Sequence, residues 1–298
     1  MWYVAKGVSG EFSLLYNRFM PKLIVTHQHP DLDAITSVWL LVRFDQSRYG
    51  DAAFAFVPAG TTYKNERVDS DPDVVHTDVG FGHYDHHQPG APKTCASELV
   101  YTDLIEQGLV SPTDTALKDI VEHVLQIDHF LDCFWPEAGE SRFAFSLSEI
   151  IPALHRLQVY DNEAVLHMTF GYLDAVYQRL KDTIKGKEAV HEGETFESVW
   201  GKTVVVSTGT DDVSKIAQKM GYAMVISKDP VKGYLKIKLR PGTDPNLDAL
   251  YAKIHTLEPE SWFYHNSGLM LFSGTDKGAT REPTKLTLPQ VVELVKGV

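Results

Sequence analysis

Short segments of the chain bring together carboxylates and imidazoles, the side chains that most often bind divalent metal ions. One is Thr26-His27-Gln28-His29-Pro30-Asp31-Leu32-Asp33-Ala34, which begins where an apolar run ends and finishes where a helical pattern starts. Open α/β sheets bind ligands at such strand ends, and one imidazole beside two carboxylates favours a bound cation there. Helix capping by Asp31 or Asp33 is the alternative, because aspartate is a good N-cap residue.

A second segment places similar groups after another predicted strand. Asp78 ends the run Val74-Val75-His76-Thr77-Asp78, and Tyr84-Asp85-His86-His87-Gln88 follows shortly after it. Asp78 can therefore point to the same edge of the sheet as the first segment. Adjacent histidines after an aspartate can supply one nitrogen ligand, a carboxylate that orients it, and a second imidazole that meets substrate. A solvated histidine pair is the alternative interpretation.

Asp128 lies among apolar neighbours in Leu125-Gln126-Ile127-Asp128-His129-Phe130, where an unpaired carboxylate is costly to bury. Metal ligation would offset that cost. The combined set of oxygen and imidazole donors suits two divalent ions, with manganese as the first choice and magnesium as the alternative, more than zinc. Two ions ~4 Å apart can lower the pKa of a water and hold a phosphoryl oxygen during in-line attack. The candidate metal ligands are His27, Asp31, Asp33, Asp78, His86 and Asp128.

Alternating apolar runs and helical patterns in the first half predict parallel strands with crossover helices. The strands are expected at 22–26, 53–58 and 74–79, and the helices at 33–43, 97–106, 114–125 and 147–156. A long amphipathic helix is expected at 162–187. The polar segment 188–194, with Gly193 inside it, predicts an irregular linker and a domain boundary.

The pattern restarts after this boundary and predicts a smaller α/β domain. Strands are expected at 203–207, 223–227, 234–239 and 269–272, and helices at 213–220, 247–255 and from Pro289 onward. The fold class is therefore α/β, a parallel-sheet domain followed by a linker helix and a smaller α/β domain. The expected limits are 20–160 for the metal-binding domain, 161–194 for the connecting helix and linker, and 195–298 for the second domain. Residues 1–19 are either an added strand or the product of an over-extended start codon.

Composition narrows the range of partners. The chain has 28 basic and 40 acidic residues, a net charge of -12, which disfavours long nucleic acid and favours small anionic substrates. No stretch approaches the ~20 apolar residues that span a bilayer, so we expect a cytoplasmic protein without a membrane partner. Cys95 and Cys133 form neither a disulfide framework nor a metal knuckle, and we expect buried free thiols. A homodimer is compatible with the sequence.

The order of the motifs resembles that of the DHH phosphoesterase superfamily, which is named for the triplet that stands here as Asp85-His86-His87. The resemblance covers nearly the whole chain after Met20. It implies that His27 and Asp31 hold one metal ion, that Asp33, His86 and Asp128 hold the other, and that Asp78 bridges them. It also implies catalytic roles for Asp78, Asp85 and His87, with His87 contacting the scissile phosphate.

The second half resembles the DHH-associated substrate domain, in the order of the strand ending at Arg240, a helix near 247–254, and the loop His265-Asn266-Ser267-Gly268. That family's loop has three glycines before its histidine, whereas Trp262-Phe263-Tyr264 stand here. Arg240, His265 and Gly268 are the implied substrate-binding residues, and a guanidinium binds phosphate bidentately. The alternatives are a surface ion pair for Arg240 and a core histidine for His265.

The resemblance implies hydrolysis of phosphodiester bonds in short oligonucleotides or small nucleotides, of the exonuclease, nanoRNase or cyclic-dinucleotide phosphodiesterase type. One alternative is a manganese-dependent inorganic pyrophosphatase, which shares the metal motifs but carries a Ser-Arg-Lys-Lys run that this chain lacks. Another is a non-catalytic nucleotide-binding regulatory module with a decayed metal site. The intact set of candidate ligands disfavours that alternative.

Overall fold

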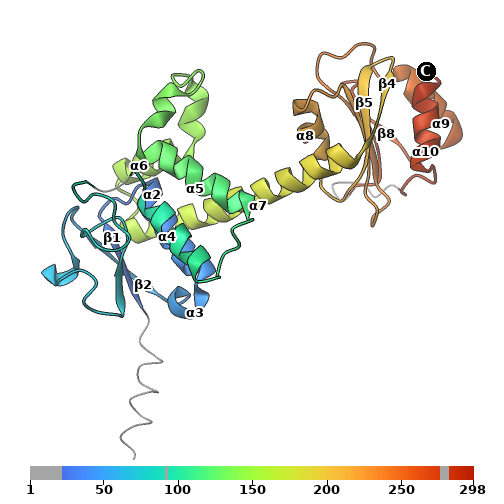
Figure 1. Cartoon of the computed structure of the whole chain (residues 1–298). Helices are drawn as coiled ribbons and strands as arrows, with labels where there is room; N and C mark the ends of the chain where they lie inside the picture. Colours follow the sequence, from blue (N-terminus) through green and yellow to red (C-terminus); the bar gives the residue numbers. More distant parts are fainter. Residues whose placement is uncertain (1–21, 91–92, 276–281) are drawn as a thin grey trace, which may run out of the picture. The chain divides into compact units, whose positions relative to one another are not determined.

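The computed structural model describes residues 22–90, 93–275 and 282–298 of the chain, and Figure 1 shows its elements. The predictions for residues 1–19 lie outside this described part. The chain divides into two compact units, Met1–Tyr177 and Gln178–Val298, and each is treated separately below. The division lies inside 161–194, the segment expected to connect the two domains.

The first unit contains a three-stranded parallel sheet in the order β2-β1-β3. Its strands are β1 (Leu23–His27), β2 (Ala53–Val57) and β3 (Val74–His76). The register pairs the first residue of β1 with the first residues of both neighbours, so the carboxyl ends of the strands lie at one edge. The predicted parallel sheet is confirmed, and this shared edge is where the candidate ligands begin.

Helices α2 (Leu32–Phe44), α4 (Ala96–Glu106) and α5 (Thr115–Asp128) pack against one another beside this sheet (Figure 1). Helix α2 follows β1 after a short turn and is buried along most of its length, because apolar or small side chains dominate it up to Leu41. The remaining short elements of the unit are α3 (Gln46–Tyr49), α6 (Leu147–Leu157), η1 (Tyr63–Asn65), η2 (Leu131–Phe134) and η3 (Ser141–Phe145).

Helix α7 (Asn162–Glu192) contributes residues to both units. In the first unit, Asp174 accepts hydrogen bonds from the Trp39 indole at 3.0 Å and from the Arg43 Nε at 2.9 Å. In the second unit, Val190 is fully buried in a cluster with Val204 and neighbouring apolar residues.

The segment 188–194 is not the irregular linker that its polarity predicted. Residues through Glu192 are helical, and Glu194 starts strand β4. Burial of Val190 supplies the packing that keeps this polar stretch in the helix. Gly193 allows the close approach between the two elements, since a Cβ there would lie 2.8 Å from the carbonyl oxygen of Val205.

The second unit contains a six-stranded mixed sheet in the order β4-β5-β6-β7-β9-β8. Among its described strands, β5 and β6 pair in parallel and the other neighbours pair antiparallel. The strands are β4 (Glu194–Ser198), β5 (Gly201–Ser207), β6 (Met224–Lys228), β7 (Leu235–Leu239), β8 (Phe263–Tyr264) and β9 (Met270–Ser273). Strands β4 and β8 were not predicted, because β4 is largely polar and β8 is very short.

Alternate residues of this sheet pack into two different apolar clusters. Helices α9 (Asp248–Leu257) and α10 (Leu288–Lys296) contribute to the larger cluster, which also contains Ile226 and Ile237. The smaller cluster includes residues of helix α8 (Val213–Lys219) and Val225. The predicted second α/β domain is therefore confirmed as a mixed sheet with helices.

The two cysteines differ in their surroundings. Cys95 is a buried free thiol, as predicted, but Cys133 is exposed, so that prediction was wrong for Cys133. The reason is local, because Cys133 lies in η2, none of whose residues is buried. Among the described residues, no helix combines the length and apolar character needed to cross a lipid bilayer.

Candidate metal centre

The turn between β1 and α2 carries the first candidate ligands. His27 is the last residue of β1, and Asp31 is the N-cap of α2. One oxygen of Asp31, Oδ1, accepts the backbone N–H groups of Asp33 and Ala34 at 3.0 and 3.1 Å. The helix-cap interpretation is therefore right for Asp31, and the cap also fixes this carboxylate at the edge of the sheet.

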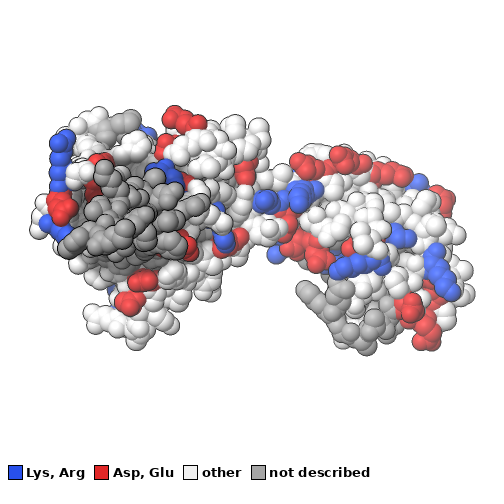
Figure 2. All heavy atoms as spheres, turned by 90° about the horizontal axis from the view of Figure 1, so that it is seen from below, with Lys and Arg blue, Asp and Glu red and all other residues white. Residues whose placement is uncertain are grey.

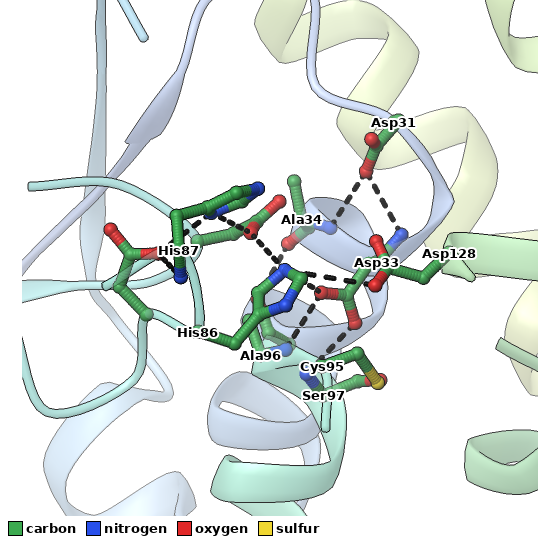
Figure 3. Close-up of polar contacts among 12 residues, drawn as sticks. Asp31, Asp33, Ala34, His86, His87, Cys95, Ala96, Ser97 and Asp128 are labelled. Carbon is green, nitrogen blue, oxygen red and sulfur yellow. Dashed lines mark hydrogen bonds and ion pairs between the residues drawn. The ribbon is translucent and has the colours of Figure 1, made fainter. Parts of the chain in front are cut away.

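Asp33 does not cap its own helix but binds the start of another helix of the first unit. It is almost fully buried, and its two oxygens accept the backbone N–H groups of Ala96 and Ser97 at 2.7 and 2.9 Å (Figure 3). These N–H groups open helix α4, where the positive end of the helix dipole stabilises a carboxylate. Asp33 thus joins the starts of α2 and α4.

The sequence predicted a strand over 74–79 that contains Asp78. The observed strand β3 ends at His76, so Asp78 lies two residues beyond it. Its backbone φ is 57°, and its N–H donates to the carbonyl oxygen of Tyr84 at 2.8 Å. The loop therefore closes on itself after His76, which ends the strand early. The same closure returns the Asp85-His86-His87 triplet to the sheet edge.

Asp85 orients the second histidine of the triplet. Its Oδ1 lies 2.8 Å from Nδ1 of His87 and accepts the backbone N–H of His87 at 3.1 Å, while its Oδ2 accepts the backbone N–H of Phe81 at 2.6 Å. The His87 side chain is 55% exposed although Asp85 is buried. The imidazole is thus held at Nδ1 by Asp85, and its other nitrogen remains available to a ligand.

The two oxygens of Asp78 face two different histidines. Oδ2 lies 3.3 Å from Nε2 of His27, and Oδ1 lies 3.3 Å from Nε2 of His86. The same His86 nitrogen is 3.7 Å from Oδ2 of Asp128 and 3.9 Å from Oδ2 of Asp33. The structure therefore brings all the predicted ligand side chains together, in groups whose ligand atoms lie within 4.8 Å of one another. Two of these groups are His27, Asp31 and Asp78, and Asp33, His86 and Asp128, and a third joins Asp78 and His86 to His87.

A pair of divalent ions fits the chemistry of these groups. Among the described residues, Oδ1 of Asp78 and Nε2 of His86 are buried and lie 3.3 Å apart without the geometry of a hydrogen bond, and a cation bound by both would satisfy them. Nδ1 of His27 lies 2.9 Å from the carbonyl oxygen of Gln28, which turns Nε2 toward Asp78. Metal-binding histidines commonly use the other ring nitrogen in this way.

The histidines of the centre hold protons in the absence of metal. Burial lowers the pKa of His27, but the contacts with Asp78, the Gln28 carbonyl oxygen and Asp31 together outweigh burial and raise it to about 9. The contact with Asp78 likewise raises the pKa of His86 to about 9. Burial raises the pKa of Asp33 to about 7 and also raises the pKa of Asp128. Burial opposes the charged form of Asp78 as well, but the two histidines outweigh it and hold the pKa of Asp78 below its usual range.

A cavity of about 360 Å³ adjoins the centre. Asp78, Asp128 and His87 line it, so the candidate metal ligands and the exposed imidazole face the same space. Sequence reasoning missed Gly60 and Phe81, which also line this cavity, because neither residue type carries a local signal of function.

Two supporting residues were also missed. His155 places Nε2 3.0 Å from the carbonyl oxygen of Pro30, and Asn162 accepts the backbone N–H of His29 at 3.1 Å. Both contacts hold the turn that carries Asp31. They join residues more than 100 positions apart, so no spacing rule could have found them.

The candidate substrate residues of the second unit lie at the edge where β7 ends and β8 turns into β9. Arg240 is exposed, and its backbone N–H donates to the carbonyl oxygen of Ala223. His265 is also exposed, so the core-histidine alternative was wrong, and its Nδ1 accepts the backbone N–H of Ser267 at 3.1 Å. Gly268 has a φ of 71°, a conformation that the tight turn requires and that glycine adopts readily.

Fold and site together define an α/β protein with a candidate two-ion centre of carboxylates and imidazoles. No family model matches the chain, and no curated protein matches it. The solved structures that are similar to it include two of RecJ. RecJ from Thermus thermophilus in complex with Mg²⁺ has 16% identity and a TM-score of 0.31, over 96% of this chain and 51% of that one. Exonuclease RecJ bound to manganese has 14% identity and a TM-score of 0.31, and the match covers 96% of this chain and 92% of that one. This chain spans about half the length of the first, and similarity this low does not define its activity.

Proposed function

We propose that this chain is a two-metal phosphoesterase of the DHH type that hydrolyses phosphodiester bonds in short oligonucleotides or small nucleotides. The observation that carries the proposal is the position of Asp78 between His27 and His86, with one carboxylate oxygen toward each. A shared carboxylate between two ligand groups is the arrangement that holds two ions close enough to act on one phosphoryl group.

The chain's own residues take distinct roles in this proposal. Bound at the two ligand groups, divalent ions would supply Lewis-acid activation of a water and of the phosphoryl oxygens. His87 faces the cavity and would donate a hydrogen bond to an oxygen of the scissile phosphate. Asp85 would keep the His87 ring in position through its contact with Nδ1. Asp33 would hold a ligand position rigid through its bonds to α4.

Short substrates suit the charge and the size of the site. The net charge of -12 repels a long polyanion. In the view of Figure 2, the basic side chains of the described residues of each unit form separate groups among acidic and uncharged residues and no continuous stripe. The cavity of about 360 Å³ is in the range of small-molecule sites. In the second unit, Arg240 and His265, beside the turn at Gly268, are proposed to bind a phosphate group.

The test uses full-length protein stripped of metal and reloaded with manganese or with magnesium. The substrates are pyrophosphate, linear dinucleotides, cyclic dinucleotides and short RNA and DNA oligomers, and the products are separated by chromatography. Asp78→Asn removes the shared charge with little change in size. Asp51→Asn is the matched control, because Asp51 is an exposed aspartate outside the centre.

Mononucleotide release that requires added metal and is lost in Asp78→Asn, but not in Asp51→Asn, supports the proposal and names the substrate class. Hydrolysis of pyrophosphate alone would replace the proposal with the pyrophosphatase alternative. Metal binding without turnover of any substrate would instead favour a nucleotide-binding regulatory role.

A further inference from the structure

The second unit contains a cavity of its own, with a volume of about 250 Å³. It lies at the carboxyl ends of β5 and β6, the strands of this sheet that pair in parallel. The segment 208–212 between β5 and α8 forms one side of it, and Ser227 and residues of β7 form another. The carboxyl ends of neighbouring parallel strands are a common place for ligands in α/β sheets.

Two lysines of β7 enter this cavity from the sheet. Lys236 and Lys238 alternate with Leu235, Ile237 and Leu239, which are buried in the larger apolar cluster, so both lysines project from the opposite face. The Lys238 side chain is only partly exposed, and its ammonium group makes no hydrogen bond or ion pair with another described residue. Burial, and then the charge of Lys236, lower the pKa of its ammonium group. An ammonium group in this position favours an anionic partner.

Hydroxyl groups supply further donors around the lysines. Thr208 accepts the backbone N–H of Thr210 at 3.1 Å and donates to the Thr210 hydroxyl at 3.2 Å, so the Thr210 hydroxyl proton is left to point elsewhere. Ser227 is buried and pairs in register with Lys236. Lysine and hydroxyl donors together are a typical environment for phosphate oxygens.

The acidic residues of the cavity already have partners. Asp212 forms an ion pair with Arg179, and Asp229 accepts the backbone N–H groups of Val231 and Lys232, each at 2.8 Å. Asp211 is 3.1 Å from the Lys236 ammonium, but its side chain is 88% exposed. An incoming anion can therefore displace Asp211 into solvent without burying an unpaired charge.

We propose that this cavity binds a phosphate dianion, either inorganic phosphate or the phosphate of a nucleoside monophosphate, through Lys238, Lys236 and the Thr210 hydroxyl. The site belongs to the second unit alone and does not depend on metal or on the proposed hydrolytic activity. Failure of the test for hydrolysis would therefore leave the proposal for this site unaffected.

The test is isothermal titration calorimetry on full-length protein freed of metal with a chelating resin, titrated with inorganic phosphate and, separately, with adenosine monophosphate. We expect saturable binding of both probes, which the variants below assign to this cavity and not to Arg240 and His265. Tighter binding of the nucleotide would show that the site also contacts the nucleoside. Equal binding would show that the site contacts the phosphate group alone. Both outcomes support the site.

Lys238→Gln should weaken binding by about 10-fold or more, because it removes a charge-assisted hydrogen bond. Lys215→Gln is the matched control, an exposed lysine of α8 outside the cavity, and should change affinity less than about twofold. Thr210→Val tests the same site without removing charge and should also weaken binding. Absence of saturable binding to both probes would overturn the proposal. So would binding that is unchanged in folded Lys238→Gln and Thr210→Val proteins.

Discussion

Binding of two metal ions to the centre should release protons, because the metal-free ligands hold them. The pKa values of His27 and His86 are raised to about 9, so at pH 7 each imidazole is roughly 99% protonated. Only the neutral imidazole binds a metal ion. Loading both ion positions should therefore release about two protons from the histidines. Asp33, whose pKa is raised to about 7, should add roughly half a proton.

The assay is calorimetric titration of metal-stripped protein with manganese at pH 7, in buffers that differ in their enthalpy of ionisation. The dependence of the measured heat on that enthalpy gives the number of protons released. His27→Gln should lower the number by about one. Because two protons leave as the pair of ions binds, the apparent affinity for the pair should rise with pH. Near pH 7 the increase should be roughly 100-fold per pH unit, and it should become smaller toward pH 8.5. Release of no protons at pH 7 would refute the reasoning, since it would mean that the histidines are neutral before metal binds.

The same protons set the pH dependence of stability in the metal-free protein. In the unfolded chain a histidine titrates near 6.5, below the folded value of about 9. Each histidine therefore stabilises the folded state below pH 6.5, and that contribution is lost as the pH rises through 9. For one histidine, a rise in pKa from 6.5 to about 9 corresponds to at most roughly 3 kcal/mol, because solvent screens part of the interaction. Both histidines contact Asp78, so their contributions do not add in full, and the free energy of unfolding should fall by about 3 kcal/mol over this range. Saturating manganese should oppose the fall.

His87→Gln should leave the stoichiometry of manganese binding unchanged and lower kcat at least ~100-fold, because it removes a group placed to meet substrate rather than a metal ligand; a parallel loss of metal would contradict that role. Asp33→Ala should lower the free energy of unfolding by about 1–3 kcal/mol for each N–H group of α4 that loses its acceptor, measured by urea denaturation of metal-free protein. Thr287→Ala removes the capping box that Thr287 forms with Gln290 at the start of α10 and should cost about 1 kcal/mol without changing manganese affinity.

The sequence predicted the convergence of the candidate ligands where local patterns determine it. An apolar strand that ends at His27 and a helix capped by Asp31 are both local features, and a parallel sheet brings the ends of its strands to one edge. Once Asp78 and the triplet after it follow another strand of that sheet, their convergence follows from topology. The predicted strands and helices of the first unit accordingly match the observed ones to within a few residues.

Long-range contacts explain what the sequence could not predict. Asp33 binds N–H groups more than 60 residues away, and nothing in its own segment distinguishes this from helix capping. The early end of β3 at His76 results from a loop closure at Asp78 that depends on Tyr84. The helical state of 188–192 depends on the burial of Val190, which outweighs the polar character of its neighbours.

The central claim is that two ions share Asp78. It is tested most directly by anomalous scattering from crystals of the full chain grown with manganese. The account predicts two manganese peaks about 4 Å apart on either side of the Asp78 carboxylate. One should be bound by His27 and Asp31, and the other by Asp33, His86 and Asp128. A single peak, or manganese bound away from Asp78, would contradict it.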